Sequence, residues 1–134
     1  MSPETLIERV EQASSAAFAR AELRPYAGAS GLSQAYFRRI VSLIGENPEA
    51  AKGLADRWRV LADFGDDPAL AYRIKGVSER LRGRWAASIL SFQEAGRRAR
   101  NKVDALAYRV AEVESLGRLG RTEEAIELAQ KIVG

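Results

Sequence analysis

The side chains best suited to recognition chemistry in this sequence are arginines at related positions. The stretch Ala-Leu-Ala-Tyr-Arg occurs twice, ending at Arg73 and again at Arg109. The planar guanidinium of arginine forms paired hydrogen bonds with carboxylates. An alternative interpretation is that these arginines are solvated charges that pair with Glu79 or Glu112. We predict that a positive row binds a peptide or helix of a partner protein, with an acidic partner among the candidates, through Arg39, Arg73, Arg80 and Arg109.

Positive charge is concentrated in the middle of the chain. The whole sequence has a net charge of +3, but nine basic and only two acidic residues lie between Ala69 and Val103. The runs 80–85 and 97–102 therefore raise a second hypothesis, a nucleic-acid-associated regulator whose arginines contact phosphates and whose Trp85 stacks on a base. No helix-turn-helix spacing with a convincing reading helix is present, so a protein partner remains the first hypothesis.

The sequence contains no pattern typical of a catalytic or metal site. Cysteine and histidine are both absent, which removes thiolate chemistry, the commonest general base and the commonest metal ligand. Glu123 and Glu124 are adjacent at a predicted helix start, where the helix dipole explains them and where their side chains point apart. We predict that the chain is not an enzyme, with no catalytic residue, no metal ligand and no cofactor.

Helices are the elements expected to position these arginines. Apolar residues recur at spacings of three and four, and strand signals are nearly absent. Three helix starts combine a capping side chain with proline at the first helical position, namely Ser2-Pro3, Asn47-Pro48 and Asp67-Pro68. The pattern predicts an all-α protein with seven helices near residues 3–23, 32–44, 48–63, 68–82, 85–99, 102–118 and 122–133.

Glycines divide the predicted helices into pairs. Gly45, Gly83 and Gly120 are expected at the turns, with spacings close to that of the repeated five residues. The segment 24–31 is the one clear loop and separates a leading helix from the pairs. The predicted organisation is an N-terminal helix and loop over residues 1–31, followed by a repeat domain over residues 32–134 with units near 32–66, 67–101 and 102–134.

Two of these units have small and aromatic residues at regular positions. The middle unit has Tyr72, Gly76, Gly83, Trp85, Ser88, Phe92 and Ala95, and the last has Tyr108, Gly120, Ala125, Ala129 and Ile132. These positions resemble the tetratricopeptide repeat, and the alanine- and arginine-rich composition looks like bacterial repeat scaffolds. The resemblance covers residues 32–134, although the first unit keeps only Gly45, Ala50 and Leu54, and Glu112 departs from the small residue that the family prefers.

The resemblance implies a fold, a function and a set of core residues. The fold is a right-handed superhelix of helix pairs, and the function is that of a scaffold or adaptor that binds other proteins. Tyr72, Trp85 and Phe92 are expected in the core. A lysine–asparagine clamp for a terminal carboxylate, which part of the family has, is not carried over because Val77 stands where asparagine would be needed.

Two apolar stripes could form either the core between helix pairs or an exposed groove. One contains Leu70, Ile74, Val77 and Leu81, and the other contains Leu106, Val110, Val113 and Leu116. A core is the first interpretation, and a groove for an amphipathic helix of a partner is the second. A helical bundle that holds a small ligand in such a groove is a third hypothesis for the function.

The last predicted helix has more apolar surface than one neighbouring helix would cover. Exposed apolar area of this kind marks an interface, so we predict a homodimer or a continuation in a longer chain. No apolar run approaches the roughly 20 residues that span a bilayer, and the acidic N-terminus is unlike a signal peptide, so no membrane contact and a cytoplasmic location are expected. The residues predicted to self-associate are Ile126, Ala129, Ile132 and Val133.

Overall fold

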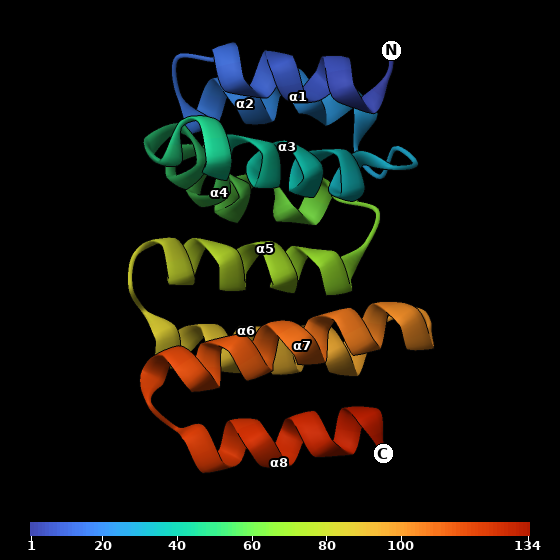
Figure 1. Ribbon diagram of the computed structural model, residues 1–134. Helices are drawn as coiled ribbons and strands as arrows, with labels where there is room; N and C mark the ends of the chain where they lie inside the picture. The colour runs from blue at the N-terminus through green and yellow to red at the C-terminus, as the bar shows by residue number, and fades with distance from the viewer. The chain divides into compact units, whose positions relative to one another are not determined.

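All regular elements of the protein are helices. The computed structural model describes residues 1–134, which divide into two compact units, Met1–Ala71 and Tyr72–Gly134. No helix combines the length and the apolar character that crossing a bilayer requires. The α-helices are α1 (Pro3–Gln12), α2 (Ala16–Leu23), α3 (Leu32–Glu46), α4 (Pro48–Leu61), α5 (Pro68–Leu81), α6 (Trp85–Arg98), α7 (Lys102–Leu119) and α8 (Thr122–Val133), with short 3-10 helices η1 (Arg24–Tyr26) and η2 (Ala62–Phe64) (Figure 1).

The predicted helix starts at proline are confirmed. Helices α1, α4 and α5 each begin at the proline, and the preceding side chain accepts a hydrogen bond from a backbone amide of the first turn. Asn47 Oδ1 accepts from the Ala50 amide at 3.2 Å, and Asp67 Oδ1 accepts from the Leu70 amide at 3.3 Å. Local sequence therefore sets these three boundaries, because the cap and the fixed φ of proline act within one turn.

The single leading helix predicted over residues 3–23 is wrong. The chain leaves the helical conformation between Gln12 and Ala16, so that α1 and α2 form a helix pair. The Ser15 hydroxyl caps α2 by accepting from the Phe18 amide at 3.2 Å. Arg57 of α4 donates to the carbonyl oxygens of Val10 at 2.7 Å and of Ala13 at 2.9 Å, which satisfies the end of α1. The protein consequently has eight α-helices instead of seven.

The turn expected at Gly45 is also misplaced, whereas those at Gly83 and Gly120 are confirmed. Helix α3 continues through Gly45 to Glu46, and α4 follows after Asn47 alone. Gly83 and Gly120 both have positive φ, +74° and +87°, at the ends of α5 and α7. A positive φ is readily adopted by glycine, which has no Cβ, and it terminates a helix.

The first unit contains two packed helix pairs. Helix α1 contacts α2 and α3, α3 contacts α4, and α2 contacts α4, so the pair α1–α2 lies against the pair α3–α4 (Figure 1). The rings of Tyr36 and Trp58 lie at the centre of this core, with centroids 4.3 Å apart. The Tyr36 hydroxyl donates to the Leu54 carbonyl at 2.6 Å, which satisfies the buried polar end of the ring.

In the second unit, α7 packs against both α6 and α8. Its core includes Ile89, Leu116 and Ala125, with Val113 and Leu128 packed beside them. Of the three aromatic residues expected in the core, only Phe92 is fully buried, with 1% of its surface exposed. Tyr72 and Trp85 are half-buried. Arginine side chains cover part of both rings, since Arg98 lies over Tyr72 and Arg80 and Arg118 lie over Trp85.

Candidate partner-binding surfaces

Arg39 links two helices of the first unit. It lies on α3, is half-buried, and donates from Nε and Nη2 to the two carboxylate oxygens of Glu11 on α1, at 2.6 and 3.2 Å. The hydrogen bond to Glu11 raises the pKa of Arg39 above its ordinary value. This two-pronged contact fixes the guanidinium in one orientation. Arg39 is therefore held by its own chain at the edge of a cleft between α1 and α3.

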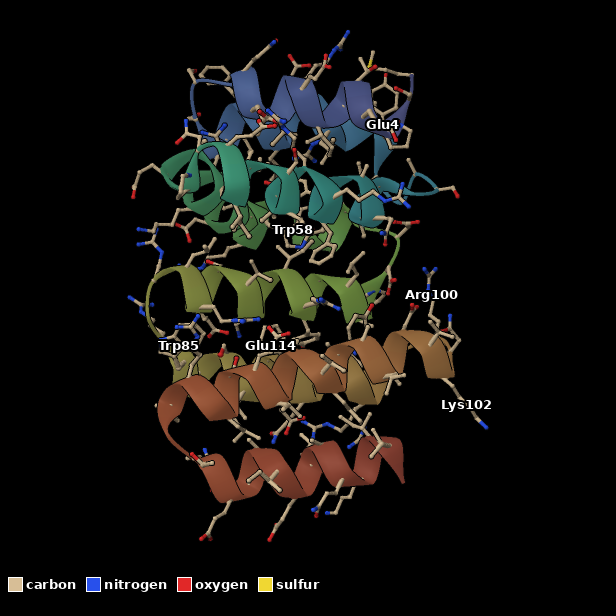
Figure 2. The ribbon with its side chains drawn as sticks, in the orientation of Figure 1. Glu4, Trp58, Trp85, Arg100, Lys102 and Glu114 are labelled. Atoms are coloured by element: carbon tan, nitrogen blue, oxygen red, sulfur yellow. The ribbon has the colours of Figure 1, made fainter.

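That cleft has an apolar floor and walls of opposite charge. Its volume is about 500 Å³. Ile7 and Ala35 are buried in its floor, with 2% and 8% of their surfaces exposed. Glu4 and Glu8 are exposed on the α1 wall, where Figure 2 shows Glu4 near the start of the helix. Arg38 is exposed on the α3 wall. The cleft can therefore bury an apolar side chain of a ligand, while the acidic residues of one wall and the basic residue of the other contact its charged groups.

Arg80 is also held within its own unit. Its Nη2 donates to Glu114 Oε2 on α7 at 2.9 Å, and its guanidinium carbon lies 5.4 Å from the ring centre of Trp85. Arg118 lies over the same ring at 5.8 Å. Figure 2 shows Trp85 and Glu114 in this part of the unit. Glu114 is thus the ion-pair partner of Arg80.

The two arginines that end the repeated five residues lie in different environments. Arg73 is half-buried over the ring of Tyr108, at 5.4 Å, and its burial lowers its pKa. Arg109 is exposed and lines a hollow of about 250 Å³ together with Arg97 and Glu112. The identical sequence therefore does not give the two side chains identical surroundings.

The structure places Arg39 in the first unit and the other three predicted arginines in the second. Arg39 and Arg80 each bind a glutamate of another helix, whereas Arg109 is the most accessible of the four. The α1 wall of the cleft was missed from the sequence. The signal was present, because Glu4, Glu8 and Glu11 recur at spacings of four and three, which is one face of a helix. A partner-binding role for the four arginines stays a prediction.

An exposed apolar face lies on the second unit. On α8, Ala125 is buried, but Ile126 and Val133 are 52% and 87% exposed, with Ala129 and Ile132 half-buried. On α7, three further apolar residues are exposed: Val103, Leu106 and Val110, at 77%, 46% and 43%. The second apolar stripe is therefore divided, with Leu116 in the core and Leu106 and Val110 outside it.

Comparison with protein-family models, with curated proteins and with solved structures finds no match. No group of three or more acidic side chains is placed to hold a metal ion.

Proposed function

We propose that the protein is an interaction module that binds a segment of a partner protein in the cleft between α1 and α3. The observation that carries the proposal is the combination of an apolar floor, at Ile7 and Ala35, with exposed charges on both walls. Recognition sites for peptides commonly use an apolar pocket for affinity and a few charges for orientation. The tetratricopeptide-like superhelix remains part of the proposal. The packing of one helix pair on another and the glycine turns at Gly83 and Gly120 support it.

The charges of the cleft define the chemistry of the segment. Glu4 and Glu8 are four residues apart, so they lie one above the other on α1. A segment with one or two basic residues next to an apolar side chain fits this wall. Arg38 on the opposite wall suits an acidic residue of the same segment. An acidic partner residue would also suit Arg109 in the second unit, where the guanidinium is exposed.

Two features of the arginine-rich middle weigh against the nucleic-acid hypothesis. Arg97 and Arg98 both donate to Glu94, at 2.6 and 2.7 Å, which neutralises part of the run. The Trp85 ring has Arg80 and Arg118 over it and is half-buried, so it is a poor platform for a base.

Selection from a displayed random peptide library on the 134-residue chain tests the proposal. We expect binders that combine an apolar residue with basic residues one helical turn apart. Replacing Glu4 and Glu8 together with lysine should weaken a selected peptide by roughly tenfold or more, because the charges then repel. Glu127→Lys also replaces a glutamate with lysine, at an exposed position of α8 outside the cleft, and should leave the affinity unchanged. Affinity should also fall as salt is raised, because exposed charges are screened.

The proposal is wrong if no peptide binds, or if the doubly substituted chain and the Glu127→Lys chain bind a selected peptide equally well. A duplex DNA probe provides the comparison for the second hypothesis. Binding of that probe with a steep salt dependence, unaffected by the two glutamate substitutions, would favour a nucleic-acid partner instead.

A further inference from the structure

A second hollow adjoins the α1–α3 cleft in the first unit. Its volume is about 230 Å³, and it is lined by residues near the C-terminal ends of α1 and α3 and by residues of α4. Leu43 and Leu54 form its floor, each with 5% of its surface exposed. Glu11 lines both this hollow and the cleft, so the Arg39–Glu11 pair forms the boundary between them. We call this second site the α4 hollow.

Arg57 lines the α4 hollow with a guanidinium that is held in place and has one edge open. Its two hydrogen bonds both leave from Nη1, which donates to the carbonyl oxygens of Val10 and Ala13 at the end of α1. The edge formed by Nε and Nη2, on the other side of the guanidinium, has no partner in the protein. Arg39 holds the two oxygens of Glu11 with this same edge. The open edge of Arg57 is therefore suited to a carboxylate.

The charge of the α4 hollow also favours an anionic group. Two charged residues line it, Glu11 and Arg57. Glu11 has its charge compensated by Arg39, whereas Arg57 is bound only by uncharged carbonyl groups. Glu49, at the start of α4, is paired with Lys52 and does not line the hollow. The leucine floor favours an anion on an aliphatic stem over a bare inorganic anion, because the stem can be buried there.

We propose that the α4 hollow binds an acidic side chain of the same partner segment that occupies the α1–α3 cleft. The inference rests on the proposed function and adds a second contact to it. Ala35 in the cleft and Leu43 in the hollow both lie on α3, two helical turns or about 12 Å apart. An extended segment covers that distance with about four residues. The acidic residue of the segment is therefore about four positions from the apolar side chain that the cleft buries.

Gly53, on α4, allows the hollow to be filled without displacing its walls. It lines the hollow, and a Cβ atom added there has nothing within 4 Å. The probe is a fluorescently labelled peptide selected on the natural chain. We expect Gly53→Leu to weaken its binding roughly tenfold or more, because the acidic side chain then loses its charged hydrogen bonds. Gly45→Leu is the matched control: Gly45 is helical, has nothing within 4 Å of an added Cβ, and lines neither site. It should leave the affinity unchanged.

Paired substitutions in the peptide and in the protein test the contact with Arg57. Replacing the acidic residue of the peptide with its amide keeps the shape of the side chain and removes its charge. Arg57→Lys keeps a positive charge and a donor for the end of α1, but removes the Nε–Nη2 edge. Each change alone should weaken binding roughly tenfold, as expected for loss of a charged hydrogen bond. The two together should weaken it little further, because they remove the same contact. Circular dichroism checks that all variants keep their helices.

Failure of this inference is distinguishable from failure of the proposed function. If lysine at positions 4 and 8 weakens the peptide but Gly53→Leu does not, the segment binds in the cleft alone and the inference is wrong. Equal weakening by Gly53→Leu and Gly45→Leu also overturns it, as do selected peptides without an acidic residue. So does full additivity of the amide substitution and Arg57→Lys. If no peptide binds, or if neither the glutamate nor the Gly53 substitutions change the affinity, the proposed function fails as well.

Discussion

At the scale of single residues, Gly76 is the position where the absence of a side chain matters most. A Cβ atom added there would lie 2.3 Å from Cε1 of Phe92, well inside van der Waals contact. Phe92 is buried on α6, so its ring has little room to move aside. Gly76 therefore allows α5 and α6 to approach closely in the second unit.

Gly76→Ala is expected to lower the free energy of unfolding by about 1–3 kcal/mol, the usual cost of overpacking a core. This loss should exceed the gain of about 1 kcal/mol that alanine brings to a helix. Gly96→Ala is the control, because Gly96 is also helical and has nothing within 4 Å of the added Cβ. It should raise stability slightly. Urea unfolding monitored by circular dichroism distinguishes the two variants. Equal effects would show that Phe92 can move.

At the scale of the helices, boundaries set by local signals were predictable and those set by distant contacts were not. The proline starts of α1, α4 and α5 depend on residues within one turn. The end of α1 depends on Arg57, more than forty positions away in sequence. Ser15 was the available signal for the start of α2, but the strong helix preference of the neighbouring alanines concealed it.

Arg57→Met is expected to destabilise the first unit by about 2 kcal/mol. The substitution keeps much of the apolar stem but removes the charged hydrogen bonds to the Val10 and Ala13 carbonyls. Arg59→Met, on the exposed side of the same helix, should have little effect. Urea unfolding monitored by the fluorescence of Trp58 measures both. If the two variants are equally stable, the break between α1 and α2 does not depend on Arg57.

The start of α3 should make stability depend on acidic pH. The Asp66 carboxylate accepts hydrogen bonds from the amides of Gly31 at 2.7 Å and Ser33 at 2.9 Å. Burial opposes its charge, but these hydrogen bonds outweigh burial and hold the pKa of Asp66 below its ordinary value of 3.8. A carboxylate with a lowered folded-state pKa stabilises the protein above the unfolded-state pKa and ceases to do so as pH falls through the folded-state pKa.

Asp66→Asn is accordingly expected to cost about 1 kcal/mol at pH 7, within the range for loss of a helix cap. The difference from the natural chain should shrink as pH falls below 3.8. Urea unfolding at several pH values, with Trp58 as the reporter, measures it. Asp63→Asn at exposed Asp63 provides a comparison, because that carboxylate is bound by Arg20 and does not touch α3. A difference that stays constant down to acidic pH would contradict the capping role of Asp66.

At the scale of the whole molecule, each unit carries one tryptophan and one candidate surface. Trp58 belongs to the first unit, with the α1–α3 cleft, and Trp85 belongs to the second, with the exposed apolar residues of α7 and α8. The sequence predicted an all-helical chain and apolar self-association residues on α8. It could not predict the cleft, because the cleft arises from α1 packing on α3, and the sequence pattern puts residues 1–31 outside the repeats. For Leu106 and Val110 the sequence favours a core position over an exposed groove, because periodicity does not distinguish a buried face from an exposed one.

A perturbation in one unit should be reported mainly by the tryptophan of that unit, because the chain divides into two compact units, each with its own internal contacts. In the Asp66→Asn chain, the urea midpoint seen by Trp58 should fall further than the midpoint seen by Trp85. In the Gly76→Ala chain the order should be reversed. Single-tryptophan chains, Trp85→Phe and Trp58→Phe, provide the separate signals. Midpoints that shift together in both cases would show that the two units unfold as one cooperative body.

The Arg39–Glu11 pair gives the cleft a way to reject ligands as well as to accept them. A strongly basic segment that competes for Glu11 must separate it from Arg39 and leave that guanidinium without its counter-charge. Such a segment gains less binding free energy than the number of glutamates suggests. A segment that also contains an acidic residue provides Arg39 with a new carboxylate in place of Glu11. The cleft should therefore discriminate by the order of charges along the segment, and net positive charge alone should be a poor guide to what it binds.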